Sequence, residues 1–245
     1  APAGSFHSAR GLVKCRTIVQ TSPWGTSVTH AAITGWGKCL PPNVLTNADL
    51  ATFLDTNDEW ITSRTGISER RISHVSLEEM AYVSSMRALA AAGLDPADVE
   101  LIVIGTCSFD DQVPNQASGL QVRLGAKRAA AYDVNTACTS FLYALSTANA
   151  LIRTGVVNNA VAVGGELISA FMDWHNRGLC VLFGDGCAAV VLQATDTVEG
   201  LLGEKLGCDW TTDYRDMLRR DDIHVIGIYT PSGLHRDIAI EAAEA

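Results

Sequence analysis

The central part of the chain alternates short apolar runs with longer stretches whose apolar residues recur every three or four positions. VELIVIGTCS (99–108), AAAYDVN (129–135) and NAVAVGGEL (159–167) have the length and β-branched content of buried strands. Between them, NQASGLQVRLG (115–125) and SFLYALSTANALIRTG (140–155) have helical periodicity. Strands that alternate with covering helices predict a layered α/β fold.

Segments on either side of this region extend the pattern. THAAITGWGKCLP (29–41) is typical of a strand that ends in a proline-marked loop, and SLEEMAYVSSMRALAAAG (76–93) has the serine, early acids and closing glycine of a complete helix. GLCVLFGDGCAAVVLQAT (178–195) predicts two antiparallel strands around a Gly-Asp-Gly turn, and VEGLLGEKLG (198–207) predicts a further edge strand. The turn, Gly184 to Gly186, is therefore assigned a structural role.

Composition excludes two classes of partner. Hydrophobic residues make up 47% of the 245 residues, which predicts a sizeable core, and the net charge of −9 argues against nucleic acid. Apolar runs such as 187–192 are far shorter than the roughly 18 residues of a membrane span, and the N-terminal residues lack the apolar core of a secretory signal. We expect a cytoplasmic protein that binds no membrane.

The cysteines form no obvious framework. There are seven, which is an odd number, and they include no CxxC pair and no metal-ligand spacing, so we expect neither a disulfide scaffold nor a metal site. Most are expected to be small buried hydrophobes. They are Cys15, Cys39, Cys107, Cys138, Cys180, Cys187 and Cys208.

Cys138 has a particular position, in YDVNTACTSF (132–141), between a predicted strand and a predicted helix. At a helix start the free backbone N–H groups and the helix dipole favour a thiolate, and the same N–H groups can hold the oxyanion of an acyl-transfer intermediate. Ala137 and Thr139 are small enough to admit an acyl group. Position alone leaves a catalytic cysteine and a buried structural cysteine equally open.

Three motifs resemble the β-ketoacyl-acyl-carrier-protein synthase III family of the thiolase superfamily. They are TNADLATFLDTNDEWITSRTGISERR (46–71), DVNTACTSFLYAL (133–145) and VLFGDGCAAVVL (181–192), in that order. The resemblance runs from about His30 to Cys208. It implies a thiolase-like layered α/β fold, of which we expect this chain to hold the N-terminal half only, followed by a short α/β tail.

The resemblance also implies functional residues. Cys138 matches the acylated nucleophile, while Trp60, Arg64 and Arg177 match positions that contact coenzyme A, where an indole stacks on adenine and a guanidinium meets phosphate. The alternatives are a core aromatic for Trp60 and surface ion pairs for the two arginines. Val113 stands where family members often carry an aromatic side chain beside the acyl tunnel, so a bulkier starter group is expected.

The implied reaction moves an acyl group from acyl-CoA, as substrate, to the cysteine and condenses it with malonyl acyl carrier protein, without a separate cofactor. Family members complete the site with an HxAN histidine and an NTS-like asparagine, and this sequence contains neither motif. His224 and His235 have other surroundings, and Asn135 belongs to the nucleophile loop. We therefore expect acylation without condensation, and a homo-oligomer because family subunits join through their sheets.

The two ends of the chain differ from the middle. Residues 1–28 resemble neither family and are unassigned, and 29–209 are expected to form the synthase-like domain. The remainder, 210–245, is expected to be a partial Rossmann-like oxidoreductase segment, because 211–245 resembles part of the nucleotide-binding domain of the Gfo/Idh/MocA oxidoreductases. The glycine-rich phosphate loop of such a domain has no counterpart before it.

Three functions are therefore open. The first is an acyltransferase and condensing enzyme of fatty acid or polyketide initiation, incomplete as this chain. The second is a non-condensing remnant that binds acyl thioesters or pairs with another subunit. The third is a fragment of an NAD-dependent oxidoreductase, against which the missing glycine-rich loop counts.

Overall fold

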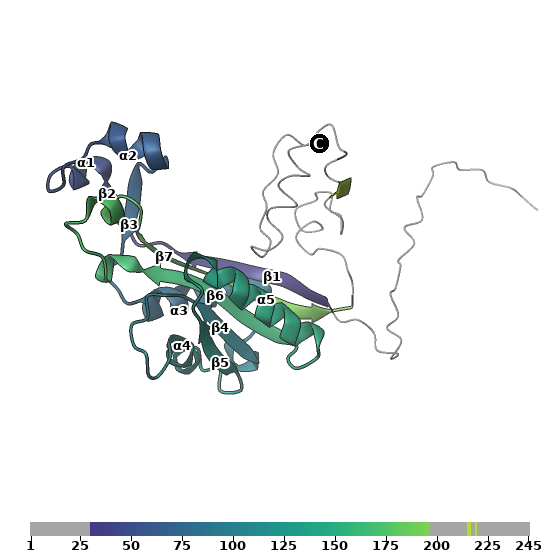
Figure 1. The fold of residues 1–245 in the computed structure, drawn as a ribbon. Coiled ribbons are helices and arrows are strands. Elements are labelled where there is room, and N and C mark those ends of the chain that lie inside the picture. The colour runs from purple at the N-terminus through teal and green to yellow at the C-terminus, as the bar shows by residue number, and fades with distance from the viewer. Residues whose placement is uncertain (1–29, 197–214, 217–218, 220–245) are drawn as a thin grey trace, which may run out of the picture.

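A computed structural model describes residues 30–196, 215–216 and 219 of the chain. A central sheet carries helices on both faces, and a smaller group of helices and strands lies at one end of it (Figure 1). In chain order the elements are β1 (His30–Cys39), β2 (Asn43–Thr46), α1 (Asn47–Leu50), α2 (Asp58–Thr65), β3 (Glu69–Ile72), α3 (Leu77–Ala92), η1 (Pro96–Asp98), β4 (Leu101–Gly105), α4 (Gln116–Leu124), β5 (Ala130–Val134), η2 (Ala137–Thr139), α5 (Ser140–Arg153), β6 (Asn159–Leu167), η3 (Ile168–Ala170), α6 (Arg177–Cys180) and β7 (Asp185–Thr195).

The central sheet has the strand order β1-β7-β6-β4-β5, and β2 pairs with β3 in a separate two-stranded sheet. β4 runs parallel to β5 and β6, whereas β7 is antiparallel to both β6 and β1. Because parallel strands end at the same edge of a sheet, the residues that follow β4, β5 and β6 meet at one edge. This carboxyl edge is where functional groups of α/β sheets gather.

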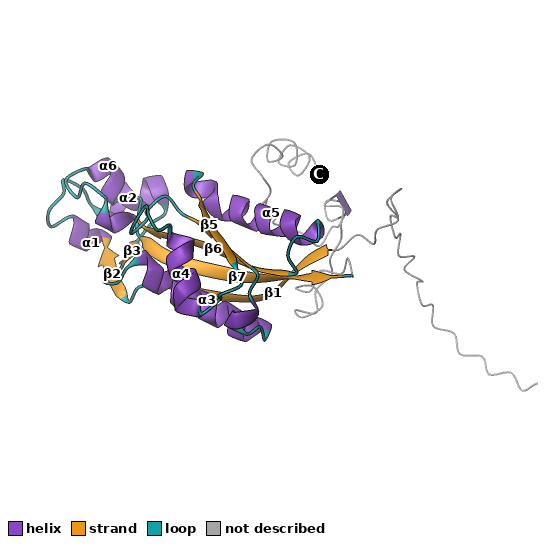
Figure 2. Cartoon of the chain, turned by 90° about the horizontal axis from the view of Figure 1, so that it is seen from below, coloured by secondary structure: helices purple, strands orange, loops and turns teal. Residues whose placement is uncertain are grey.

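Helices cover both faces of the sheet, which explains the continuous apolar run of β4. Figure 2 shows α5 on one face and α3 with α4 on the other. Leu101 and Val103 pack in the cluster beneath α5, while Ile102 and Ile104 pack in the cluster beneath α3 and α4. A strand buried on both faces needs apolar side chains at every position. The predicted layered α/β fold is therefore confirmed.

The predicted helix at 76–93 is present as α3, with both of its expected caps. The Ser76 side chain accepts a hydrogen bond from the Glu79 N–H, and Gly93 ends the helix in the left-handed conformation at φ 66°. α3 lies directly on β1 because β1 has a glycine where they touch. A Cβ on Gly35 would stand 2.3 Å from the Ala88 carbonyl oxygen.

The predicted hairpin at 178–195 is wrong. A short helix, α6, precedes a single long strand, β7, which begins at Asp185 and pairs with two neighbours that are distant in sequence. The Asp185 carboxylate accepts hydrogen bonds from the Ser73 N–H at 2.7 Å, the Ser169 N–H at 2.9 Å and the Ser169 hydroxyl at 2.6 Å. Asp185 is thus structural, as expected, but it joins separate segments instead of forming a tight turn.

Several predictions lie outside the described residues. These are the edge strand at 198–207, the surroundings of His224 and His235, and the ends of the chain, 1–28 and 210–245, so the domain boundaries stay predictions. Within the described residues, no helix is long and apolar enough to cross a membrane, and no group of three or more His, Cys, Asp or Glu side chains could hold a metal ion.

The smaller lobe is organised around a buried guanidinium. Arg70 in β3 is only 5% exposed, and burial lowers its pKa. Its Nη1 donates to the Leu45 carbonyl at 3.2 Å, and its Nη2 donates to Asn47 Oδ1 at 2.9 Å and to the Val181 carbonyl at 3.0 Å. One side chain therefore joins β2, α1 and the end of α6.

Replacing Arg70 with methionine should destabilise the lobe by about 3 kcal/mol, because three buried acceptors lose their donor. Arg71→Met is the matched control, since Arg71 is 38% exposed and its contacts with Pro41 and Glu69 are long, at 3.4 Å. Denaturant unfolding measures both variants. Equal stability of Arg70→Met and Arg71→Met would contradict the role of Arg70.

Candidate functional site

Cys138 lies in η2, a single turn between the end of β5 and the start of α5. Ala137 has φ 52°, a left-handed conformation that costs an L-residue about 1–2 kcal/mol. The Ser140 hydroxyl accepts a hydrogen bond from the Thr136 N–H at 2.9 Å and donates one to the Ala137 carbonyl at 2.7 Å. The predicted corner is thus present, and it is a strained, hydrogen-bonded turn.

The Cys138 side chain is exposed, so it is not the buried core cysteine that the sequence left open. Thr139, at the cap position of α5, makes no side-chain hydrogen bond to the helix. The first N–H groups of a helix have no partner within the helix and carry its positive dipole end. An exposed sulfur at such a position can attack an electrophile whose oxygen gains negative charge.

Two glycines set the height of α5 above the sheet. A Cβ on Gly105, at the end of β4, would lie 2.4 Å from the Ser140 carbonyl carbon. A Cβ on Gly164, in β6, would lie 2.8 Å from the Phe141 Cβ. Real Cβ atoms do not come so close to other heavy atoms, so the first turn of α5 rests on bare backbone. The position of Cys138 follows from this contact.

A second thiol lies at the same carboxyl edge. Cys107 follows β4 and is exposed. Among the described cysteines only Cys180 and Cys187 are buried, so the expectation that most are buried is not met there. The Cys107 N–H donates to Glu166 Oε1 at 3.0 Å, and the Glu166 carboxylate also accepts hydrogen bonds from the Thr106 hydroxyl at 3.0 Å and the Ser108 hydroxyl. Sequence analysis missed this group, although the ends of three neighbouring strands could have indicated it.

Although Cys107 is exposed, the partial burial of its thiol raises its pKa, and the Glu166 carboxylate raises it further. Cys138 contributes to the same rise in the Cys107 pKa, and the two cysteines follow strands that are neighbours in the sheet. The carboxyl edge therefore brings together Cys138, Cys107 and the carboxylate that holds the loop after β4.

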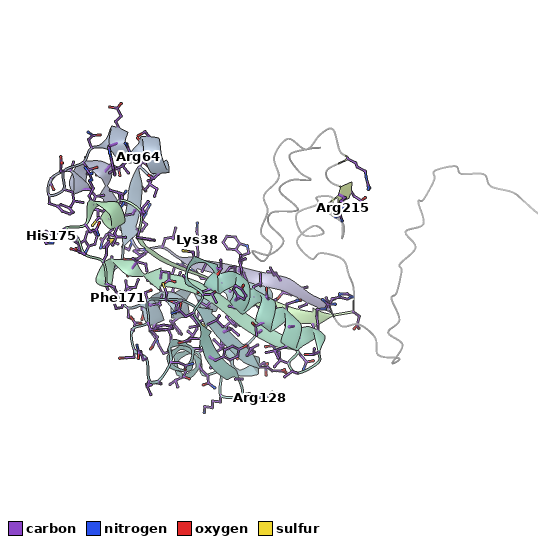
Figure 3. All side chains as sticks on the ribbon, in the orientation of Figure 1. Lys38, Arg64, Arg128, Phe171, His175 and Arg215 are labelled. Carbon is purple, nitrogen blue, oxygen red and sulfur yellow. The ribbon has the colours of Figure 1, made fainter. Side chains whose placement is uncertain are left out.

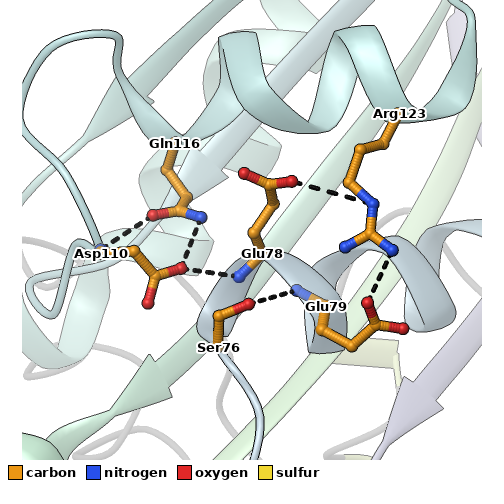
Figure 4. A network of polar contacts seen from close by, with 6 residues as sticks. All are labelled: Ser76, Glu78, Glu79, Asp110, Gln116 and Arg123. Carbon is orange, nitrogen blue, oxygen red and sulfur yellow. Dashed lines mark hydrogen bonds and ion pairs between the residues drawn. The ribbon is translucent and has the colours of Figure 1, made fainter.

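The loop between β4 and α4 is tied to the start of α3, as Figure 4 shows. The Asp110 carboxylate accepts hydrogen bonds from the Leu77 N–H at 3.2 Å and the Glu78 N–H at 2.9 Å, and Gln116 Nε2 donates to it at 3.0 Å. Val113 lies on this loop with 91% of its surface exposed. Within this single chain its side chain is open to solvent, and its role beside an acyl tunnel stays a prediction.

Trp60, Arg64 and Arg177 form a separate cluster on the small lobe, where Figure 3 labels Arg64. The guanidinium carbon of Arg64 stands 4.5 Å from the indole centroid of Trp60, and that of Arg177 stands 4.6 Å from it. Arg177 Nη1 also donates to the Asp55 carbonyl at 2.8 Å. The structure thus brings together three of the predicted residues, two cations and an aromatic ring, and places Cys138 and Val113 elsewhere.

Comparison with known proteins gives a consistent family. Residues 132–209 match the family model of 3-oxoacyl-[acyl-carrier-protein (ACP)] synthase III. The chain is 52% identical, over 180 residues, to a β-ketoacyl-[acyl-carrier-protein] synthase III from Vibrio vulnificus, and the match covers 74% of this chain and 50% of that protein. The chain therefore spans about half the length of the curated relatives it matches.

Solved structures give the same result. The 3-oxoacyl-[acyl-carrier-protein] synthase III of Aquifex aeolicus superposes with a TM-score of 0.67 at 42% identity, over 68% of this chain and 55% of that one. The priming β-ketosynthase of the R1128 polyketide pathway superposes with a TM-score of 0.67 at 33% identity, over 69% of this chain and 51% of that one. The described fold is the one that these proteins share, which confirms the predicted thiolase-like fold.

Gly105→Ala should push the start of α5 off the sheet, with a loss of about 1–3 kcal/mol in unfolding free energy and a changed alkylation rate at Cys138. Gly186→Ala is the matched control, since its Cβ would meet only the end of the Leu40 side chain at 3.4 Å. Denaturant unfolding and iodoacetamide labelling of the tryptic peptide 129–153 measure the two effects. Identical results for the two variants would contradict the role of Gly105.

Proposed function

We propose that this chain derives from the 3-oxoacyl-[acyl-carrier-protein] synthase III family, whose named members match up to 74% of its length, and that Cys138 accepts an acyl group from acyl-CoA. The observation that carries the proposal is the exposed thiol on a strained turn at the start of α5. The relatives of this chain are named for synthesis of β-ketoacyl groups on acyl carrier protein, and acyl transfer is the step of that chemistry which needs a thiol.

The chemical step uses few groups of this chain. The Cys138 thiolate attacks the thioester carbonyl carbon, and the oxygen gains negative charge as a tetrahedral intermediate forms. N–H groups at the start of α5 stabilise that oxygen, because they are positively polarised. Collapse of the intermediate breaks the bond to the coenzyme sulfur, which leaves as a thiolate and takes up a proton, while the acyl group stays on Cys138.

The coenzyme is held by Trp60, Arg64 and Arg177 in this proposal. An indole face offers a stacking surface to adenine, and guanidinium groups pair with phosphate oxygens. The positions of both guanidinium groups over the indole ring support a site for a ligand that combines a flat ring with negative charge. No further cofactor is proposed. Val113 is proposed to face the acyl chain, and its small size to allow bulky starter groups.

Condensation of the acyl group with a malonyl thioester is the second half of the family reaction. Acyl carrier protein is the proposed partner of the acylated chain, as the names of the relatives indicate for those proteins. The sequence contains no HxAN motif and no NTS-like asparagine motif to stabilise the enolate of a decarboxylating malonyl thioester. Acylation and condensation should therefore separate in this chain.

Association with further chains is also proposed. Among the described strands, β5 lies at an edge of the central sheet, and unpaired edges bind other strands. Large apolar side chains are exposed near the sheet, among them Trp36 at 63% and Phe171 at 65%. Both features support a homo-oligomer.

The tail, 211–245, is proposed to derive from an oxidoreductase of the Gfo/Idh/MocA type, on the sequence resemblance alone. Apart from Arg215, Asp216 and Arg219 it lies outside the described residues. Since no glycine-rich phosphate loop precedes it, no nicotinamide chemistry is proposed for this chain.

Incubation of the whole chain with acetyl-CoA should add one acetyl group to Cys138, found by mass spectrometry in peptide 129–153. Cys138→Ser should abolish the adduct, and Cys39→Ser, on the far strand β1, should keep it. Addition of malonyl acyl carrier protein should give no β-ketoacyl product. Absence of the adduct refutes the acyl-transfer proposal, and Cys138-dependent product refutes the separation of the two steps.

Trp60→Ala should raise the acetyl-CoA concentration that gives half-maximal acylation by about tenfold, because one base-stacking contact is worth about 1–3 kcal/mol. Trp36→Ala is the control, since Trp36 is an exposed tryptophan on β1 and outside the cluster. Single-turnover acylation at several coenzyme concentrations separates a binding effect from a rate effect. An unchanged concentration dependence in Trp60→Ala contradicts the assignment of this cluster.

A further inference from the structure

We propose that Cys107 and Cys138 form an intramolecular disulfide when a hydroperoxide oxidises this chain. The two residues follow neighbouring parallel strands that end in register, with Gly105 opposite Val134. The Thr106 N–H donates to the Val134 carbonyl at 3.1 Å, so the pairing continues past the strand ends. Both thiols are exposed at the same carboxyl edge.

Each thiol is presented by a defined backbone. The strained turn at Ala137 and the Ser140 hydroxyl hold the Cys138 corner. The Glu166 carboxylate accepts a hydrogen bond from the Cys107 N–H at 3.0 Å and thereby holds the loop that carries Cys107. Cys107 comes two residues after the end of β4 and Cys138 four residues after the end of β5, and these two strands are hydrogen-bonded neighbours. A second cysteine therefore stands beside the proposed nucleophile on an independently anchored loop.

The redox step balances with one peroxide and two thiols. The Cys138 thiolate attacks a peroxide oxygen, the O–O bond breaks, and Cys138 becomes a sulfenic acid while hydroxide leaves and takes up a proton. The Cys107 thiol gives up its proton, its thiolate attacks the Cys138 sulfur, and the S–S bond forms as the S–O bond breaks. The sulfenic oxygen leaves as hydroxide, which takes up a proton and becomes a second water. The peroxide is reduced to two waters, and the two thiols lose their hydrogens.

Glu166 gives this step a pH dependence. Burial, followed by the Glu166 carboxylate, raises the pKa of the Cys107 thiol, so near neutral pH this thiol is protonated. The resolving attack needs its thiolate. Disulfide formation should therefore accelerate as the pH rises toward the raised pKa. Glu166→Gln should lower that pKa and make the reaction faster near neutral pH.

The chain contains an internal comparison. Cys39 and Cys187 stand directly opposite each other in the antiparallel pair of β1 and β7. However, Cys187 is only 3% exposed, and burial raises its pKa to about 12. Cys187 should therefore stay reduced under the same treatment. Pairing in the sheet alone does not select the disulfide; exposure at the carboxyl edge does.

The consequence for acyl transfer rests on the proposed function of Cys138. A disulfide removes the nucleophile, so the oxidised chain should not be acylated by acetyl-CoA, and dithiothreitol should restore acylation. Cys107 would thus protect Cys138 from further oxidation, because a sulfenic acid without a resolving thiol proceeds to sulfinic and sulfonic acids, which dithiothreitol does not reverse.

The experiment treats the whole chain with hydrogen peroxide, alkylates the remaining thiols and digests it with trypsin without reduction. Cys107 lies alone in peptide 88–123 and Cys138 alone in peptide 129–153, so their disulfide appears as one linked pair. Linkage of these two peptides, with Cys187 alkylated only after denaturation, is the expected result. Cys39→Ser should leave the pair unchanged.

Cys107→Ser should give no linked pair and should accumulate sulfinic and sulfonic acid on Cys138. Far-ultraviolet circular dichroism of each reduced variant tests its fold, and wild type alone decides the linkage if a variant is unfolded. Absence of the linked pair in wild type, or linkage of other cysteines in its place, overturns the inference. Linkage in a chain whose reduced form takes no acetyl group leaves the disulfide standing and refutes only the proposed function.

Discussion

The contact between the first turn of α5 and the bare backbone of β4 and β6 is the constraint on which the candidate site depends. Gly105 and Gly164 place no side chain between helix and sheet, so Ser140 and Phe141 pack directly against the backbone of the strands. Ser140 can then bond to the turn before it, and that turn holds Cys138 at the edge of the sheet. The corner is thereby determined by packing beneath it as well as by its own residues.

Carboxylates that bind backbone N–H groups connect this corner to the rest of the fold. Glu166 holds the loop after β4, and Asp185 joins the start of β7 to segments before α3 and after β6. Asp133, in β5, accepts hydrogen bonds at 2.8 Å from the Gln116 and Ala117 N–H groups at the start of α4. These carboxylates accept hydrogen bonds from helix and loop N–H groups that would otherwise lack partners. Part of the negative charge of the chain therefore has a structural role.

The site has two parts that differ in physical character. At the carboxyl edge, two thiols stand on segments that follow the adjacent strands β4 and β5, beside a carboxylate near the end of β6. On the small lobe, the cluster of Trp60, Arg64 and Arg177 is an electrostatic and stacking surface over the core around Leu50 and Ile61. A thioester substrate with a long, charged coenzyme needs both kinds of surface, which is the arrangement that the proposed function uses.

The sequence by itself determined the strands and helices of the layered fold, the caps of α3 and the corner that carries Cys138. These features depend on local periodicity, on turn chemistry and on residues close together in the chain. Only the tertiary structure decided that Asp185 and Gly186 begin a long strand, because the donors to Asp185 come from Ser73 and Ser169, distant in sequence. The placement of Cys107 and Cys138 after neighbouring strands required the sheet order, which local patterns do not encode. The contact of Arg177 with Trp60 required α2 and α6 to meet in the small lobe.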